Sequence, residues 1–311
     1  MSSENKPIIV IGMHRSGTSA LSGELDSLGV FMGRSLYKAQ KGVNEKGFFE
    51  NARLVELNEA IQDSLTTSWD DPLSILKLDL KPEPNFYQRA SSFINQEYLG
   101  KSLWGMKDPR VSVLLNFWSD IFEQLSIKPN YILMIRDPIE VARSLEKRDK
   151  FSIDKGLMLW LNYNFASYNG TKNQQRLVVS FTELLADPVA IRQQIAQSFG
   201  IELNQDKKTF IENSLRTHVT DHSAVKDQDE LTHLSYKLYE AIKSEDDLLV
   251  EELHNQYLDY CSSINKVLIE HSDRILVSEV KFRNLFEDAY NTIWWKAMWP
   301  FRYIGRMLKK Q

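Results

Sequence analysis

Residues 8–28 join a short apolar run to a glycine-containing loop. Ile8 to Ile11 favour a strand, Ala20 to Leu28 favour a helix, and the loop between them reads Gly12-Met13-His14-Arg15-Ser16-Gly17-Thr18-Ser19. Such a strand, loop and helix direct backbone N–H groups and a helix N-terminus at an anion. The two glycines have the spacing of the ATP-type loop G-x-x-x-x-G-K-[ST], but Thr18 stands at the lysine position. The loop therefore predicts a phosphate site with Arg15 as its only cation.

A second segment combines a strand end with a helix start. Residues 131–135 are apolar and are followed by Arg136, Asp137 and Pro138. Asp137 is a good N-cap, and proline suits the first turn of a helix. Ser144 then lies about two turns into that helix. An arginine at a strand end is thus followed, eight positions later, by a serine.

The two segments resemble the motifs of the sulfotransferases that use 3′-phosphoadenosine-5′-phosphosulfate (PAPS), in a bacterial, carbohydrate-sulfotransferase-like branch. Their 5′-phosphosulfate loop reads like [KR]-[ST]-G-[ST]-[ST], which residues 15–19 match. Their 3′-phosphate motif is an arginine at a strand end with a serine eight positions on, which Arg136 and Ser144 match. The resemblance spans residues 7–220. It implies PAPS as donor and transfer of its sulfuryl group to a hydroxyl, with a glycan as the expected acceptor.

The resemblance assigns donor contacts. Arg15 would contact the 5′-phosphate and the bridging oxygen, where negative charge grows as sulfuryl leaves. The 5′-phosphate would also meet Ser16, Gly17, Thr18 and Ser19, while Arg136 and Ser144 would clamp the 3′-phosphate. Five of the candidate donor residues have structural alternatives. Arg15 could be a surface residue of an ordinary turn, and Ser144 could be an ordinary helix residue without a functional role. His14 could pack against the loop or cap it, and Arg136 could pair with Asp137 or Glu140. Arg216, similar to a basic segment closing over the 3′-phosphate, could be an ordinary surface arginine.

Transfer to a hydroxyl needs a group that takes its proton. The family uses His in some branches and Glu in others, and two glutamates lie in the segment 44–50. Glu50 matches the Gly-aromatic-aromatic-Glu pattern of a bacterial branch and is favoured as the base. Glu45 matches Asn-Glu-x-x-Phe-Phe of glucosaminyl-type enzymes and is the second candidate. Glu50 could equally be an acid favoured by a helix dipole.

Two further segments are candidates for the acceptor side. In Trp104-Gly-Met-Lys107-Asp108-Pro-Arg110, Lys107 could reach the transferring group, and Asp108 or Arg110 could orient the acceptor. Asp108 before a proline is equally a plain N-cap. Trp69 and Asp70 could line the acceptor cleft because aromatic faces suit sugars, although most tryptophans belong to a core.

The pattern predicts an α/β fold with a P-loop-like parallel sheet flanked by helices, since apolar runs alternate with helical stretches. In such sheets ligands bind at the C-terminal strand ends. The predicted strands are Ile8–Ile11, Leu103–Met106, Tyr131–Ile135 and Leu177–Val179. The predicted helices include Ala52–Leu65, Val111–Leu125, Pro138–Arg148 and Pro188–Phe199.

Three regions are expected: a sulfotransferase-like domain at 1–222, a helical hairpin or coiled-coil extension at 223–290, and a tail at 291–311. Two apolar stripes suggest the extension, which could also carry a homodimer contact: Leu231, Leu234, Leu238 and Ile242, then Leu249, Leu253, Tyr257 and Cys261. The tail has three tryptophans and five basic residues but no acid, a composition typical of a helix lying on anionic lipid. Its aromatic side chains could instead dock on the protein or on a second subunit.

Composition limits the remaining classes. A net charge of −4 gives no indication of nucleic-acid binding, and the single cysteine none of an oxidising compartment. No secretory signal or spanning segment is apparent, so we expect a cytoplasmic protein, peripheral at the inner membrane face through its tail. No Cys/His spacing suggests zinc, and no metal is expected because arginines would take the role of Mg²⁺. The rival functions are a P-loop small-molecule kinase, a nucleotide-binding module without catalysis, and a helical scaffold.

Overall fold

The computed structural model describes residues 7–37, 49–202, 208–211, 229–263, 277–285 and 287–288. The chain divides into two compact units, residues 1–263 and residues 264–311. In the second unit, residues 277–285 are helical. The predicted tail 291–311 and the segments containing Glu45 and Arg216 lie outside the described residues.

A parallel sheet forms the centre of the first unit. Its strand order is β2-β1-β3-β4, with β1 at Ile8–Ile11, β2 at Gly105–Lys107, β3 at Asn130–Ile135 and β4 at Arg176–Ser180. Ile9 lies opposite Met106 of β2 and Tyr131 of β3. The predicted α/β class with a parallel sheet is confirmed. Because all pairings are parallel, the C-terminal ends of these strands share one edge.

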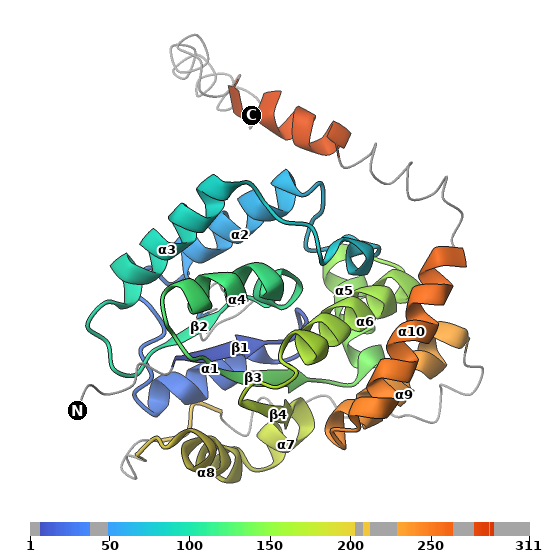
Figure 1. Cartoon of the computed structure of the whole chain (residues 1–311). Helices are drawn as coiled ribbons and strands as arrows, with labels where there is room; N and C mark the ends of the chain where they lie inside the picture. Colours follow the sequence, from blue (N-terminus) through green and yellow to red (C-terminus); the bar gives the residue numbers. More distant parts are fainter. Residues whose placement is uncertain are drawn as a thin grey trace, which may run out of the picture. The chain divides into compact units, whose positions relative to one another are not determined.

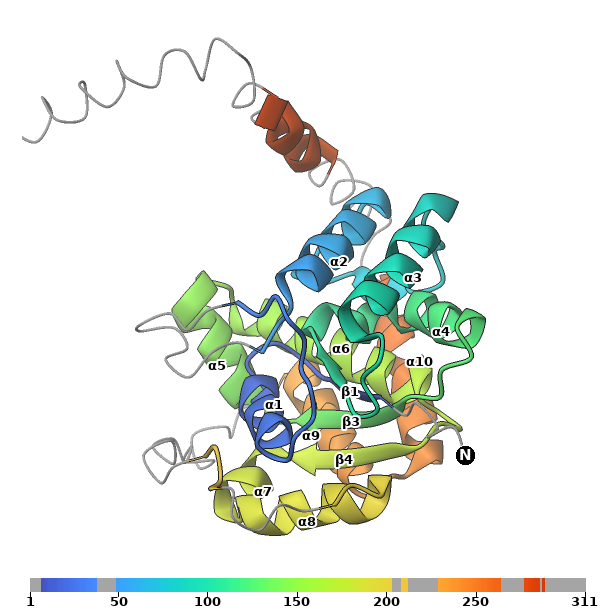
Figure 2. The same cartoon turned by 90° about the vertical axis from the view of Figure 1, so that its left-hand side faces the viewer.

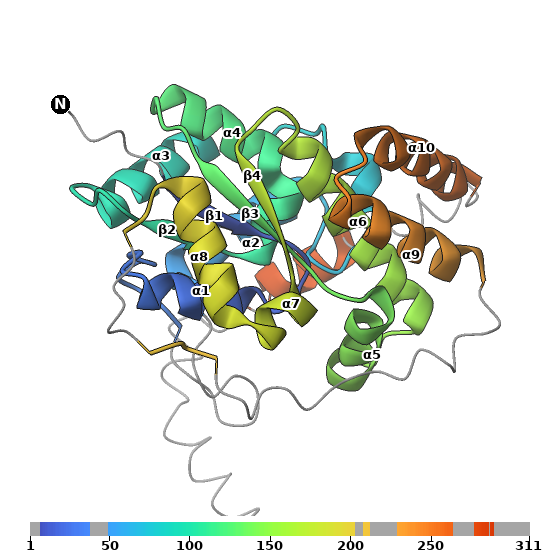
Figure 3. The same cartoon turned by 90° about the horizontal axis from the view of Figure 1, so that it is seen from below.

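Helices cover both faces of the sheet. They are α1 Thr18–Ser27, α2 Ala52–Ser64, α3 Pro84–Tyr98, α4 Leu115–Gln124, α5 Pro138–Asp149, α6 Ile153–Gly170, α7 Phe181–Ala186, α8 Pro188–Phe199, α9 Glu230–Lys243 and α10 Asp247–Ser263, with 3-10 helices η1 Ser74–Lys77 and η2 Pro109–Leu114. Figure 3 shows α1, α7 and α8 in front of one face. Ile8 and Val10 pack on that side, whereas Ile9 and Ile11 point into the larger core on the other face. Figure 2 shows α2 and α3 side by side.

Local sequence signals fix several helix starts. The carboxylate of Asp137 accepts a hydrogen bond from the Glu140 N–H at 2.9 Å, so the predicted cap is present. Asp187 caps α8 in the same way, with a proline next. The predicted helix 111–125 differs: it begins as the 3-10 helix η2, capped by Asp108, and becomes α-helical only at Leu115.

The helices α9 and α10 fall within the stretch 223–290 that was expected to form a helical extension, and they belong to the same compact unit as the sheet. Figure 1 shows both helices beside α6. The stripe residues Leu234, Leu238 and Ile242 are buried in the same core as Trp160 of α6. The Tyr257 hydroxyl of α10 donates to Asn162 Oδ1 at 2.8 Å. The apolar stripes are therefore used inside this unit, where α6 offers a buried surface along most of its length.

We predict that Leu238→Ala lowers the free energy of unfolding of the whole first unit by about 2–5 kcal/mol, the cost of a cavity at a buried leucine. Leu238 is 0% exposed, whereas Leu248 on α10 is 82% exposed and provides the matched control. Leu248→Ala should change stability by less than about 0.5 kcal/mol. Urea unfolding followed by tryptophan fluorescence measures both. A separate early transition of the helices, with the sheet unaffected, would contradict their place in the common core.

Candidate functional site

Two glycines shape the loop between β1 and α1. Gly12 has φ +136°, and a Cβ there would lie 2.3 Å from the Met134 carbonyl oxygen of β3. Gly17 has φ +93° and occupies the N-cap of α1. Neither position accepts a side chain without strain. The Gly12 N–H donates to Ser112 Oγ at 2.9 Å, which ties the loop to η2.

The two predicted phosphate motifs meet. The Nε of Arg15 donates to Ser144 Oγ at 2.8 Å, across 129 positions of sequence. The Nη1 of Arg136 donates to the Arg15 carbonyl oxygen at 3.1 Å. Arg136 also pairs through Nε with Glu140 at 2.8 Å, one of the alternatives that its sequence position allowed. Arg136 thus supports the loop after β1 through a hydrogen bond, and Glu140 of α5 balances the charge of Arg136.

The last residue of β2, Lys107, approaches the start of α1. Lys107 Nζ lies 2.5 Å from Glu50 Oε1 and 3.1 Å from Ser19 Oγ. The Lys107 side chain is 2% exposed and that of Glu50 16%. Glu50 directly precedes Asn51, which caps α2. The carboxylate of Glu50 forms an ion pair with Lys107 and does not cap the helix. The favoured proton acceptor is therefore in the site, with its charge committed to an ion pair in the ligand-free protein.

Asp108 lies beneath the site. It is fully buried, caps η2 through the Arg110 N–H, and accepts from Arg110 Nη1 at 3.0 Å and from Asn58 Nδ2 at 2.9 Å. Arg110 also pairs with Glu59 at 2.7 Å. Burial alone would lower the pKa of Arg110, but these two carboxylates outweigh it and the pKa is raised. Asp108 can act on an acceptor only through Arg110.

A cavity of about 310 Å³ opens beside the loop. Its lining comes from the loop after β1 and the start of α1, the segments before and after α2, the end of β2, the start of η2 and the end of α5. The residues are His14, Arg15, Thr18, Ser19, Glu50, Trp69, Lys107, Pro109, Arg110, Arg148 and Asp149. Trp69 is half-buried, and the Arg148 guanidinium lies 5.3 Å from its ring centre. Asp70 does not line this cavity and pairs with Lys155 at 2.8 Å.

His14 packs between two aromatic rings. Its ring centre is 4.8 Å from that of Trp69 and 5.8 Å from that of Tyr163. Burial lowers the pKa of His14 well below its usual value, and the charges of Arg110, Arg148, Lys107 and Arg15 lower it further. The imidazole is therefore neutral at physiological pH in the ligand-free protein.

Sequence reasoning missed three residues of the site: Arg148, Asp149 and Ser112. Arg148 follows Ser144 by four positions, so both lie on one face of α5, and this spacing was a usable signal. For Ser112 the sequence gives no such signal, because no neighbouring residue indicates that its hydroxyl accepts a hydrogen bond from Gly12. Within the described ranges, no group of three or more His, Cys, Asp or Glu side chains is placed to hold a metal ion. In the same ranges, no helix is both long and apolar enough to cross a bilayer.

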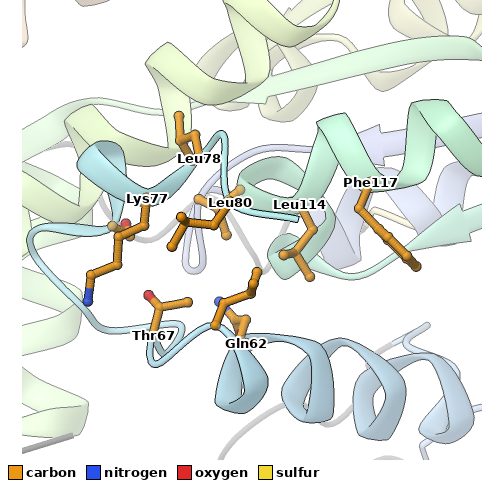
Figure 4. A pocket seen from close by; sticks show the side chains of 10 residues that line it. Gln62, Thr67, Lys77, Leu78, Leu80, Leu114 and Phe117 are labelled. Carbon is orange, nitrogen blue, oxygen red and sulfur yellow. The ribbon is translucent and has the colours of Figure 1, made fainter. Parts of the chain in front are cut away.

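A second cavity is too small for a substrate. It measures about 20 Å³, enough for one water molecule. Figure 4 shows Gln62, Thr67, Lys77 and Leu114 among its lining side chains. Gln62 Nε2 is buried without a hydrogen-bond partner in the described structure, so a single water suits this position.

Comparisons with known proteins give only distant likenesses. No protein-family model and no curated protein sequence matches the chain. Among solved structures, the sulfotransferase domain from the Synechococcus PCC 7002 olefin synthase is 17% identical, covering 82% of this chain and 95% of that chain, with a TM-score of 0.46. The sulfotransferase domain from the curacin biosynthetic pathway is 15% identical, covering 64% and 75%, with a TM-score of 0.40. At these values neither likeness assigns a function to this chain.

We predict that Asp108→Ala lowers the free energy of unfolding by about 3–5 kcal/mol, because it leaves a buried arginine without its buried partner. Glu59→Ala removes the other carboxylate of Arg110 and is the matched control. The Glu59 side chain is 47% exposed, so its loss should cost less than about 1 kcal/mol. Urea unfolding at neutral pH measures both. Equal losses from the two variants would contradict a supporting role for Asp108 beneath the cavity.

Proposed function

We propose that the protein is a PAPS-dependent sulfotransferase that moves a sulfuryl group in line to an acceptor hydroxyl. The observation that supports this most is the hydrogen bond between Arg15 and Ser144. It brings the 5′- and 3′-phosphate motifs together at the strand ends, beside a cavity with room for an acceptor. Parallel α/β sheets bind ligands at this edge.

The donor groups have defined tasks in this proposal. Arg15, Lys107 and the N-terminus of α1 would hold the phosphosulfate end and favour charge developing on the bridging oxygen. Ser16 and Gly17 of the loop, with Thr18 and Ser19 at the start of α1, would bind the 5′-phosphate, and Arg136 with Ser144 would hold the 3′-phosphate. Bound PAPS supplies the activated sulfuryl group. Because Ser144 is a neutral partner, a phosphate can replace it on Arg15 with a stronger, charge-assisted bond.

The acceptor is proposed to be a carbohydrate hydroxyl. Trp69 offers a half-buried aromatic face in the cavity wall, next to the cationic Arg110 and Arg148. Glu50, which the sequence favours as proton acceptor, lies in the same wall and is paired with Lys107. Lipid binding by residues 291–311, with the peripheral cytoplasmic location that it implies, stays a sequence-based prediction, as does a homodimer.

A small-molecule kinase is the main rival, since the loop shares the glycine spacing of ATP-binding proteins. The feature against it is Thr18 at the lysine position. A module that binds the nucleotide without catalysis would use the same donor residues and transfer nothing. The donor experiment separates these three functions.

We predict transfer of label from ³⁵S-labelled PAPS, and none from γ-³²P-labelled ATP with Mg²⁺, to at least one member of a panel of methyl glycosides and phenols. The physical reason is the absence of a lysine at position 18 together with a second, 3′-phosphate motif. Thin-layer chromatography of the products measures both donors. Phosphate transfer from ATP would establish the kinase instead, and binding of PAPS without any transfer, even to water, would establish the non-catalytic module.

We predict that adenosine 3′,5′-bisphosphate raises the melting temperature more than 5′-AMP does, because only the bisphosphate reaches the 3′-phosphate clamp. Arg136→Ala should weaken bisphosphate binding about 10–100-fold, as expected for hydrogen bonds to a charged group. Arg143→Ala removes the same charge from the exposed side of α5 and should bind like the wild type. Isothermal titration calorimetry measures the affinities. Equal affinities for the two nucleotides would contradict the assignment of Arg136 and Ser144 as the 3′-phosphate site.

A further inference from the structure

One buried ring nitrogen, in a residue that lines the cavity, has no hydrogen-bond partner in the described structure. His14 Nε2 is buried, and no hydrogen bond satisfies it in the described structure. The imidazole lines the same cavity as Trp69 and Lys107. A buried polar atom left unpaired costs about 1–3 kcal/mol, so such an atom in a native protein calls for an explanation. A hydroxyl group of a bound acceptor would satisfy it.

The other candidate for the proton is engaged elsewhere. Glu50 Oε1 lies 2.5 Å from Lys107 Nζ. To accept a proton, this carboxylate would have to give up the charge that balances a lysine only 2% exposed. Neutral His14 carries no such ion pair, so protonating it breaks none.

We propose that His14 Nε2 accepts the proton of the acceptor hydroxyl, and that Glu50 acts as a positioning residue that holds Lys107 against the donor loop. This inference rests on the proposed sulfotransferase function. In the step, the acceptor oxygen forms a bond to sulfur while the bond from sulfur to the 5′-phosphate oxygen breaks. The phosphate oxygen keeps that electron pair, the hydroxyl proton moves to Nε2, and the imidazolium later returns it to water.

The charges around His14 make this step depend on the donor. Four cations act on it: Arg15 in its own loop, Lys107 at the end of β2, Arg110 in η2 and Arg148 near the end of α5. The remaining titratable neighbours are the carboxylates Glu50 and Asp149, also on the cavity wall, and the hydroxyl of Tyr163 on α6. An imidazolium is disfavoured among these cations until a polyanionic donor offsets them. Donor binding should therefore make His14 a better proton acceptor.

The first test is a titration of the wild-type protein by ¹⁵N-histidine NMR, without and with saturating adenosine 3′,5′-bisphosphate. We expect the pKa of His14 to rise by about 1–3 units when the anion binds, the size of shift that nearby opposite charge produces. His254, on α10 outside the cavity, is the internal control and should not move. An unchanged pKa for His14 would overturn the coupling to the donor. This readout needs neither an acceptor nor a variant.

The second test compares variants in single-turnover release of sulfate from ³⁵S-labelled PAPS to water or to the best glycoside. His14→Gln should lower the rate about 10²–10⁴-fold and abolish its fall at acid pH. Glu50→Gln should also lower the rate but keep that pH dependence, and His254→Gln should behave like the wild type.

The outcomes separate two failures. If Glu50→Gln loses the pH dependence while His14→Gln keeps it, Glu50 is the base and the role of His14 is wrong. If the wild type transfers sulfuryl and His14→Gln is equally active, only this inference fails. If the wild type transfers none, the proposed function itself fails. His14→Gln must still bind adenosine 3′,5′-bisphosphate with wild-type affinity to support the role.

Discussion

The site depends on one close approach, that of the Gly12 backbone to the Met134 carbonyl oxygen of β3. A Cβ at Gly12 would lie only 2.3 Å from that oxygen, far inside the van der Waals distance. The absence of a side chain lets the loop cross directly above the central strands before α1 begins at Thr18. A larger residue would lift the loop and move Arg15 away from the end of β3.

Because the loop lies so close to the sheet, side chains at the ends of neighbouring strands can form hydrogen bonds with it. Arg136, directly after β3, donates to the Arg15 carbonyl oxygen, and Lys107, the last residue of β2, donates to Ser19 Oγ at the start of α1. The Ser112 hydroxyl accepts from the first residue of the loop. Each support begins within a few residues of a parallel strand, so the register of the sheet sets the geometry of the loop. The side chains that support the loop are thus placed by the strand ends from which they project.

The sequence predicts what local chemistry determines. Both ends of β1 were predicted because its apolar run stops at Gly12, and the first residue of α5 was predicted because Asp137 and Pro138 start a helix. Contacts between distant segments were not predictable in this way. The pairing of Glu50 with Lys107 joins positions 57 apart, and the burial of Asp108 depends on Asn58 of α2. The stripes of α9 and α10 show that these helices bury a face, but not that α6 receives it.

The partners of the cavity cations differ in how easily a ligand can replace them. Arg110 is held by the fully buried Asp108, which no ligand can displace without leaving an unpaired buried charge. Arg15 is held through its guanidinium by the neutral Ser144, so an incoming phosphate gains a charge-assisted bond and leaves only a hydroxyl to be satisfied. Lys107 is intermediate, since Glu50 is charged but partly exposed. An anion should therefore recruit Arg15 first, while Arg110 keeps its ion pair with Asp108 in the cavity wall.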